Sequence, residues 1–333
     1  MKAYLIRRVL LIVPAFIGIS FITFLIVQLS PGNPLMEKLR RGGEGGGVAS
    51  AAIPPEYIEQ MKKMYGLDKP VPVRYALWLR RLVMFDFGNS YKDQRPVMDR
   101  IKETLPITLQ LNIISLLLIY LIAIPIGVYS ATHPRSWRDT ITTFILFILY
   151  SLPSFWLAML LMYFFGGGPY FHWFPVYGIN SQGAQDWPWP QWLLDRSWHL
   201  VLPILCLTYA DLAGLSRYAR AGMINEIRQD YVRTAYAYGF SERTVVYKYA
   251  MRNSLIPIIT LLGALLPSMI GGSVIIESIF SIPGMGRLAF EAILSRDYPL
   301  ILGILSISSL LTLLGLIISD VLYAIVDPRI RFE

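Results

Sequence analysis

The sequence of residues 9–29 is VLLIVPAFIGISFITFLIVQL, an apolar run of 21 residues without a charged side chain. As an α-helix rising roughly 1.5 Å per residue, this run would be about 31 Å long, which matches the ~30 Å hydrocarbon core of a bilayer. Lys2, Arg7 and Arg8 precede it, as basic residues do in a secretory signal peptide. However, the run is too long for the apolar region of a signal peptide, and no small-residue cleavage site follows it. We therefore expect residues 1–29 to form a retained transmembrane helix.

Five further apolar runs of similar length follow along the chain. They occupy residues 105–131, 140–165, 199–216, 255–281 and 300–326. Prolines inside them remove helix hydrogen bonds, and membrane helices tolerate this where neighbouring helices or a water-filled cavity satisfy the freed carbonyl groups. These prolines are Pro125, Pro153, Pro203, Pro257 and Pro267. The sequence therefore predicts an all-α membrane protein with six transmembrane helices bundled around a pathway.

The composition excludes an ordinary soluble domain. Hydrophobic residues make up 55% of the chain and charged residues only 16%, whereas soluble domains carry about 25% charged residues. The mean hydropathy is +0.50. The net charge of +8 would suit a nucleic-acid partner, but no basic and aromatic RNA- or DNA-binding motif occurs. Retention of Lys and Arg on the cytoplasmic side of a membrane explains the basic charge more simply.

The distribution of basic residues predicts the orientation. With the N-terminus inside, the inner segments 1–8, 132–139, 217–254 and 327–333 together hold fourteen Lys and Arg residues. The short outer segments 166–197 and 282–299 hold three. Because short cytoplasmic loops retain Lys and Arg, we expect both termini in the cytoplasm of a multi-pass inner-membrane protein.

The long segment 30–103 should form an extracytoplasmic helical cap. Helix-like patterns occur at residues 56–65, after two prolines, and at 73–85, while Gly42–Gly47 suggests a flexible excursion. The predicted organisation is therefore a transmembrane helix at 1–29, a cap at 30–103 and a core membrane domain at 104–333.

The outer segment 166–197 is rich in tryptophan. Such rings suit either anchoring at the membrane interface, which we favour, or a platform for sugars. The four residues are Trp173, Trp187, Trp189 and Trp192.

The cytoplasmic loop 217–254 carries the clearest local signals. Asp230 suits a helix N-cap, residues 231–238 a short helix, and Gly239 the position just past its end. Tyr231, Thr234, Ala235 and Tyr238 share one face at helical spacing, and Ser241 can cap a second helix toward the membrane. We interpret the short helix as a knob that docks into a protein partner, in preference to an amphipathic helix lying on lipid.

The same loop resembles a known signature. Residues 230–239, DYVRTAYAYG, followed by Arg252-Asn253-Ser254-Leu255-Ile256-Pro257, resemble the cytoplasmic loop of ABC importer permeases of the dipeptide/oligopeptide/nickel group, in particular the dipeptide permease B-like subunits. Further matches run from one end of the chain to the other. They include residues 4–8 with 30–34, 65–70, 87–90, 105–109, 279–287, 296–299 and 327–331. Tyr236 and Tyr238 depart from the pattern, since these positions are often Arg and Lys in the group.

The resemblance implies a type I ABC importer permease fold. It implies that the loop helix couples to an ATPase subunit through Asp230, Tyr231, Arg233, Thr234, Ala235, Tyr238 and Gly239. It also implies the partners: a second homologous permease, two cytoplasmic ABC ATPases that hold ATP and Mg²⁺, and an extracytoplasmic solute-binding protein. The chain lacks a phosphate-binding Gly-x-x-x-x-Gly-Lys-Ser/Thr loop, in agreement with ATP chemistry on other subunits.

Three acidic residues near or within the apolar runs are the pathway candidates. Asp211 lies well inside the fourth run, where it could line the pathway or, as we slightly prefer, pair with Arg217 or a partner helix. Glu277 and Asp320 lie toward run ends, where hydrogen bonding to a neighbouring helix is expected. We expect no metal site, no cofactor and no catalytic residues in this chain. The histidines His133, His172 and His199 are far apart in sequence, which favours loop or interface positions over metal ligation.

The predicted function is one half of the translocation pathway of an ATP-driven importer for di- or oligopeptides. Oligosaccharides and nickel remain alternative cargoes of the same architecture. An autonomous channel or secondary transporter would need internal repeats or clustered intramembrane charges, and it would leave the loop 217–254 unexplained. A membrane-embedded enzyme would need converging nucleophile, base or metal ligands, which the sequence does not show.

Overall fold

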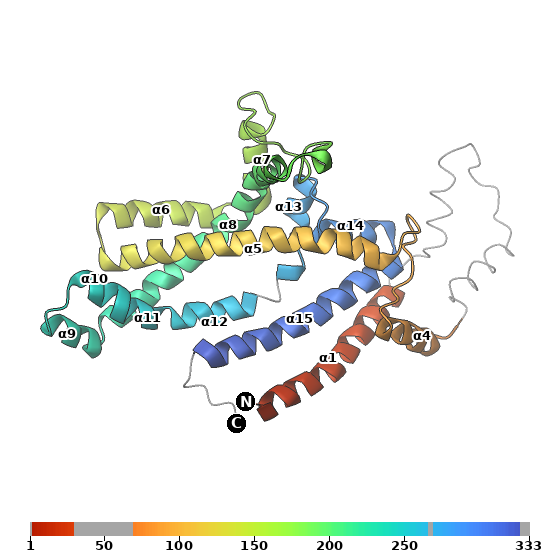
Figure 1. The fold of residues 1–333 in the computed structure, drawn as a ribbon, viewed down its shortest axis with the longest axis horizontal. Coiled ribbons are helices and arrows are strands. Elements are labelled where there is room, and N and C mark those ends of the chain that lie inside the picture. Colours follow the sequence, from red (N-terminus) through yellow and green to blue (C-terminus); the bar gives the residue numbers. More distant parts are fainter. Residues whose placement is uncertain (1, 30–68, 266–268, 327–333) are drawn as a thin grey trace. The chain divides into compact units, whose positions relative to one another are not determined.

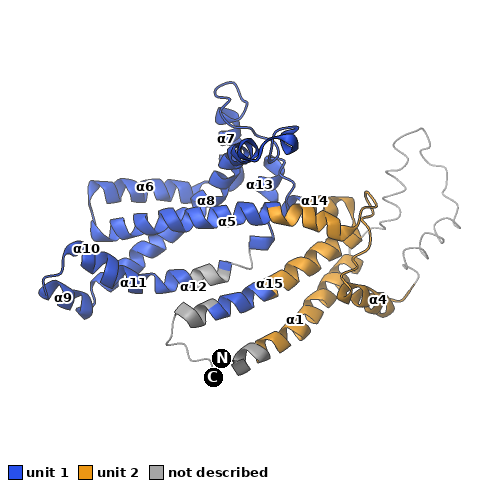
Figure 2. Cartoon of the chain, viewed as in Figure 1, with its two compact units in different colours: residues 1, 107–287, 314–333 blue, residues 2–106, 288–313 orange. Residues whose placement is uncertain are grey.

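The computed structural model describes residues 2–29, 69–265 and 269–326 (Figure 1). These residues form helices and connecting turns without a strand, and the only extended pairings among them are two isolated bridges. The contacts divide the chain into two compact units (Figure 2). One unit comprises residues 1, 107–287 and 314–333, and the other comprises residues 2–106 and 288–313. The all-α prediction is confirmed for the described residues.

From α5 to α12 the described helices follow one another with short connections, apart from the loop between α7 and α8, which contains a 3-10 turn at Ala184–Asp186. In chain order the described helices are α1 Lys2–Leu29, α4 Val71–Val83, α5 Val97–Thr132, α6 Trp137–Ser151, α7 Ser154–Phe165, α8 Trp189–Ile227, α9 Asp230–Ala237, α10 Glu242–Thr244, a π-helical turn Val245–Ala250, α11 Met251–Ser254, α12 Ile256–Leu265, α13 Val274–Ile279, α14 Met285–Ser295 and α15 Tyr298–Val326. The predicted helix 73–85 corresponds to α4, which begins and ends two residues earlier. The predictions for residues 42–47 and 56–65 lie outside the described residues.

The number of continuous membrane-length helices differs from the prediction. Within the described residues, four helices are long and apolar enough to cross a bilayer, and α6 with α7 makes a fifth crossing if the bent pair counts as one span. The predicted run 255–281 is not one helix. Its described parts are α12, α13 and a stretch at 269–273 that is not α-helical. The prediction of six transmembrane helices is therefore not confirmed.

The break between α6 and α7 has a local cause. The two helices meet at an angle of 101°. Leu152 is extended, with ψ of 132°, and Pro153 precedes the first turn of α7. A proline forces the preceding residue out of the helical region and donates no backbone hydrogen bond, so the helix ends there. Pro203 does not have this effect, because α8 continues through it.

The unit that contains residues 107–287 is organised around α8. Gly127 of α5 lies so close to α8 that an added Cβ would be 2.5 Å from Cβ of Ala219. Small residues of this kind allow two helix backbones to approach closely. One apolar cluster joins α5, α7, α8 and α13, with Leu111, Ala158, Leu202, Ile276 and Phe280 among its buried members.

The other unit places α4 against α1. Phe24 and Val27 of α1 pack with Leu302 of α15, and Tyr75 and Trp78 of α4 cover this cluster. The side-chain hydroxyl of Ser20 lies 2.9 Å from that of Tyr75, which satisfies a polar group in an otherwise apolar helix.

Most apolar side chains of α1 point away from the described protein. A helix with such a surface requires an apolar solvent, which a lipid bilayer provides. The exposed large apolar residues on α1 are Val9, Leu10, Leu11, Val13, Ile17, Phe21, Ile22, Ile26 and Leu29.

Candidate functional site

The helix α8 extends well beyond the predicted span 199–216. Its 39 residues correspond to about 58 Å, almost twice the hydrocarbon thickness of a bilayer. The first residues of the predicted loop 217–254 therefore continue this helix to Ile227. The chain then forms α9 and returns through α10, the π-helical turn and α11. Ser241 caps α10, since its side chain accepts a hydrogen bond from the backbone N–H of Thr244, as predicted.

The ends of α9 are set by local geometry. Its N-cap is Gln229, so the assignment of Asp230 as N-cap is wrong by one residue, and Asp230 is instead the first helical residue. At the other end Gly239 has φ of +79°, a region that favours glycine. The N–H of Gly239 donates to the carbonyl of Tyr236, and that of Phe240 to the carbonyl of Ala235. This pair of bonds is a Schellman motif, and it confirms the predicted helix end.

The inward face of α9 is not the face expected from the sequence. Val232 and Ala235 are 1% and 4% exposed, and they belong to a buried cluster with Val128 of α5, Met223 of α8 and Val245 of the π-helical turn. Ala235 therefore anchors the helix, and its placement on the docking face is wrong. Val232, which the sequence did not single out, is the second anchor. Both are small enough to let α9 pack closely on the helices behind it.

The outward face of α9 carries the other predicted coupling residues. Asp230, Arg233, Thr234 and Tyr238 are exposed, Tyr238 to 79%. Arg233 and Asp230 form an ion pair at 3.6 Å between largely exposed side chains, so the pair contributes little to stability. These side chains are free to meet another surface.

Tyr231 joins α9 to the end of α8. Its hydroxyl donates a hydrogen bond to the carboxylate of Glu226. Partial burial, followed by this hydrogen bond, raises the pKa of Tyr231 above its ordinary value. The side chain is thus held as a neutral donor.

An ion pair that the sequence analysis missed ties α6 to α8. Nη2 of Arg220 lies 2.9 Å from Oδ2 of Asp139, and the same oxygen accepts from the backbone N–H of Arg135 at 3.0 Å. Asp139 is almost completely buried. The two paired residues are 81 positions apart, so no local sequence pattern indicates that they interact.

Glu277 is enclosed in a cradle of glycines and donors. Its Oε1 accepts from the hydroxyl of Thr108 at 3.0 Å, and its Oε2 accepts from the backbone N–H of Arg287 at 2.9 Å. The Thr108 hydroxyl in turn accepts from the N–H of Met285 at 2.8 Å. A Cβ added to Gly284 would lie 2.4 Å from the Glu277 carboxyl carbon. The predicted hydrogen bond between Glu277 and a neighbouring helix is confirmed, and it joins the sequence motifs at 105–109 and 279–287.

Asp211 lies in a different environment. It is exposed, and it lines a cavity of about 480 Å³ bounded by residues of α5, α6, α8 and α12. Glu277 does not line this cavity. The predicted pairing with Arg217 is not formed, because the Arg217 guanidinium lies over the ring of Tyr150. Asp320 is half-buried in α15, and its hydrogen bonding to a neighbouring helix stays a prediction.

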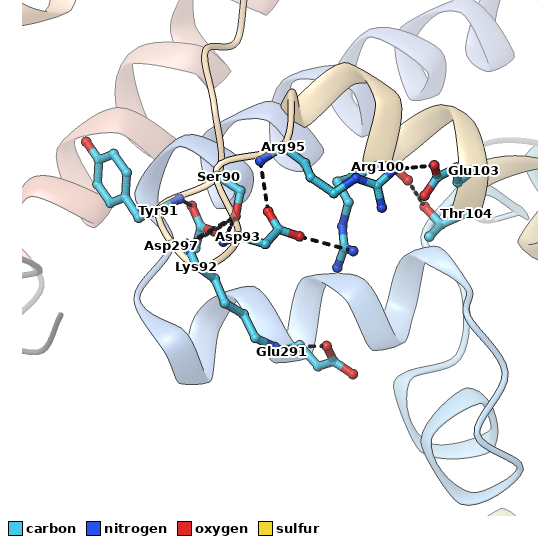
Figure 3. A network of polar contacts seen from close by, with 10 residues as sticks. All are labelled: Ser90, Tyr91, Lys92, Asp93, Arg95, Arg100, Glu103, Thr104, Glu291 and Asp297. Carbon is cyan, nitrogen blue, oxygen red and sulfur yellow. Dashed lines mark hydrogen bonds and ion pairs between the residues drawn. The ribbon is translucent and has the colours of Figure 1, made fainter. Parts of the chain in front are cut away.

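In the unit formed by residues 2–106 and 288–313, two further sequence motifs meet (Figure 3). Asp297 is completely buried and accepts hydrogen bonds from the hydroxyl of Ser90 and, at 3.0 Å, from the backbone N–H of Tyr91. Lys92 forms an ion pair with Glu291 at 3.4 Å. These contacts fasten the loop after α4 to the turn between α14 and α15, so the match at 87–90 and the match at 296–299 form one structural unit.

The described residues contain no cluster of three or more His, Cys, Asp or Glu side chains that could hold a metal ion. The expected loop or interface position is wrong for His199, which is buried within α8. Its Nδ1 lies 2.8 Å from the carbonyl oxygen of Asp195 and 3.4 Å from the carboxylate of the same residue.

Comparison with known families identifies the family of the chain. The family described as "Binding-protein-dependent transport system inner membrane component" matches residues 123–332, and its N-terminal counterpart matches residues 1–112. The chain belongs to this family. It is a permease subunit of a binding-protein-dependent transport system, and the resemblance found in the sequence is confirmed. The family consists of membrane transport components, in contrast to enzymes.

Individual relatives cover the full chain. It is 40% identical over 333 residues to the oligopeptide transport system permease protein AppB of Bacillus subtilis, with 100% of each chain covered. It is 37% identical over 362 residues to the inner membrane ABC transporter permease protein YejB of Escherichia coli O157:H7, with the same coverage. The dipeptide transport system permease protein DppB of Alkalihalophilus pseudofirmus is 35% identical over 346 residues, again with 100% of each chain covered.

Proposed function

We propose that this permease forms half of the translocation pathway of an ATP-driven importer for di- and oligopeptides, and that α9 couples it to an ATPase subunit. The observation that carries the proposal is the construction of α9. Two small apolar residues anchor its inner face, while its charged and aromatic outer face is left free at the end of a helix much longer than a membrane crossing. A surface of this kind suits a protein partner.

The proposed assembly contains a second, homologous permease, two cytoplasmic ABC ATPases that hold ATP and Mg²⁺, and an extracytoplasmic solute-binding protein. In the surrounding lipid, the interrupted segments α6–α7 and α12–α13 would complete six crossings. Broken helices are tolerated at membrane depth where they line a cavity or are buried in protein. Both termini would be cytoplasmic, and residues 30–103 would form the extracytoplasmic cap.

The anchoring cluster supports a mechanism of rigid-body transmission. Val232 and Ala235 of α9 share buried contacts with Val128 of α5 and Met223 of α8. A displacement of α9 by a closing ATPase pair would therefore move the ends of α5 and α8 with it, because close-packed interiors transmit displacements instead of absorbing them. Movement of these helices would open the pathway alternately to the two sides of the membrane.

Peptide is the proposed cargo because the relatives AppB and DppB are named as oligopeptide and dipeptide permeases. Oligosaccharides or nickel are the alternative within the same architecture. Binding of candidate cargoes to the cognate solute-binding protein would separate these classes directly.

The coupling proposal can be tested with two alanines of α9 that differ in burial. Ala235 is buried in the anchoring cluster, whereas Ala237, two residues later, is exposed. We expect Ala237→Arg to leave the permease folded but to weaken ATPase association at least tenfold, measured by co-purification and by ATP-driven uptake in proteoliposomes. Ala235→Arg should instead disrupt the packing of α9 itself, which limited proteolysis of the 228–254 region would detect.

Two outcomes would contradict the coupling role. Wild-type association and uptake by Ala237→Arg would show that the outer face of α9 does not dock. Solute movement by the chain alone, without ATP or an ATPase, would favour an autonomous channel or secondary transporter.

A further inference from the structure

The cavity beside Asp211 has the dimensions of a ligand site. Its volume of about 480 Å³ falls within the ~300–1,000 Å³ that is usual for small-molecule pockets. It lies between helices of the unit that contains residues 107–287, with walls from α5, α6, α8 and the end of α12. The apolar part of the wall is formed by Leu116, Ile119, Leu207, Leu215 and Leu265.

A single negative charge faces this space. Asp211 is the one charged residue among those that line the cavity, and no ion pair between it and another described residue is formed. Arg217, six positions further along α8, stacks on Tyr150 with its guanidinium 5.7 Å from the ring centre, and it lines a separate cavity of about 230 Å³. A carboxylate in an apolar membrane helix is costly unless a cation or water-filled space accompanies it, and such residues mark functional sites. The cavity therefore favours a cationic ligand group.

A second polar group lacks a partner at the same cavity. Ser115 of α5 is only 4% exposed, and its hydroxyl makes no hydrogen bond among the described residues. The Ser115 oxygen is itself covered, so the side chain must rotate about its Cα–Cβ bond to meet a ligand in the cavity, and a ligand with a hydrogen-bonding group would then satisfy it. Two other polar residues that line the cavity are already engaged, because Asn112 donates to the carbonyl of Met269 and Tyr120 to that of Ile258.

The chemistry of the lining disfavours two simpler ligands. A hard cation such as Ca²⁺ takes roughly six to eight oxygen ligands. This cavity offers one carboxylate and largely apolar walls. A sugar would bring many hydroxyl groups, for which the apolar wall offers few partners, and it would leave the charge of Asp211 uncompensated. A molecule with one ammonium group, adjacent amide groups and apolar side chains fits both the charge and the walls.

We infer that this cavity is a subsite for the amino-terminal end of a peptide in transit, in which the Asp211 carboxylate accepts the α-ammonium group and the Ser115 hydroxyl bonds a neighbouring amide. The inference rests on the proposed function as a peptide importer and adds to it a recognition element within the permease. The apolar wall would hold the first side chains without strong selectivity among them.

The test measures peptide binding to the permease without the binding protein, whose own preference for free amino termini would otherwise dominate. The assembled permeases and ATPases are placed in lipid nanodiscs without nucleotide, and equilibrium binding of labelled Ala-Phe-Ala is compared with that of its N-acetylated form. Because a charge-assisted hydrogen bond is lost on acetylation, we expect the wild type to bind the free peptide about tenfold more tightly.

Variants of Asp211, compared with a variant of a carboxylate outside the cavity, show whether Asp211 causes the discrimination between the two peptides. Asp211→Asn should remove the discrimination between the two peptides by weakening only the free form, and Asp211→Glu should retain part of it. Asp186→Asn, a matched change at an exposed carboxylate outside the cavity, should behave like the wild type. Ser115→Ala should weaken both peptides by a similar, smaller factor.

Three results would overturn the inference. They are equal wild-type binding of the free and acetylated peptides, discrimination that persists in Asp211→Asn, and failure of Asp211→Asn to assemble with the second permease, which would assign Asp211 to a subunit contact. Binding-protein-stimulated ATP hydrolysis and peptide uptake by the wild type test the importer function separately. A wild type that lacks both refutes the proposed function, whereas one that has both and shows no amino-terminal discrimination refutes only the subsite.

Discussion

Glu277 and Asp211 are both acidic residues in apolar stretches of one unit, yet their surroundings are opposite. Glu277 is 1% exposed and receives hydrogen bonds from the hydroxyl of Thr108 and the backbone N–H of Arg287. Asp211 faces a cavity of about 480 Å³ and forms no ion pair with another described residue. A buried acid whose donors are all supplied by its own chain belongs to the scaffold, whereas an acid that faces open volume is available to a ligand.

The glycines around Glu277 show how tightly its carboxylate is enclosed. Side chains at Gly272, Gly284 or Gly286 would place a Cβ within 3.0 Å of a Glu277 oxygen. Nothing comparable surrounds Asp211, where the nearby Gly214 has only the ring of Tyr150 as a neighbour, at 3.9 Å. The first site tolerates no added atom, and the second has space for a ligand.

The largest effect should follow from breaking the cradle at its centre. Glu277→Ala leaves the Thr108 hydroxyl and at least one backbone N–H buried without an acceptor, and each such group costs about 1–3 kcal/mol. We expect a loss of about 4 kcal/mol in the free energy of unfolding, seen as a much lower unfolding temperature of the purified permease in detergent. Glu277→Gln, which keeps one acceptor oxygen, should lose less. A wild-type unfolding temperature for Glu277→Ala would mean that the cradle is not structural.

A smaller loss should follow from filling the cradle. In Gly284→Ala the new methyl group would lie 2.4 Å from the carboxyl carbon of Glu277, which its hydrogen bonds hold in place. Overpacking of this kind costs about 1–3 kcal/mol. Gly271→Ala is the matched control, since no atom lies within 4 Å of its added Cβ, and it should unfold like the wild type. Equal unfolding temperatures for the two variants would refute the close packing around Glu277.

The smallest effect on stability should follow from changing Asp211, the acidic residue that faces the cavity. Asp211→Asn keeps the size of a side chain that faces a cavity, so its free energy of unfolding should stay within about 0.5 kcal/mol of the wild type. Thermal unfolding under the conditions used for Glu277→Ala measures this directly. A loss of several kcal/mol would indicate that Asp211 has a structural partner within the protein.

Much of the fold could be predicted because its signals are local. Run length and hydropathy located α1, α5, α8 and α15, although α8 continues well past its apolar run. The helix α9 and its end at Gly239 followed from residues within a few positions of each other. The N-cap was misplaced by one residue because Asp230 is the residue type that suits an N-cap, whereas Gln229 occupies that position without a side-chain capping hydrogen bond.

Other features could not be predicted, because identical local signals have different outcomes. Pro153 ends a helix and begins another at 101°, whereas Pro203 lies buried within an unbroken one. In α9, aromatic and small residues occur on every side of an eight-residue helix, so the pattern did not identify Val232 and Ala235 as the buried pair. For α9 the deciding partners, Val128 and Met223 among them, lie elsewhere in the chain.

The sequence by itself determined that the chain is a helical membrane protein, where most of its helices lie, and which family its motifs resemble. Only the tertiary structure decided which polar groups are hydrogen-bonded within the protein and which remain available to a ligand. Thr108 and Glu277 are 169 residues apart, and Ser90 and Asp297 are 207 apart. Hydropathy and helix propensity depend on neighbours along the chain, whereas the satisfaction of a buried hydrogen-bonding group depends on neighbours in space.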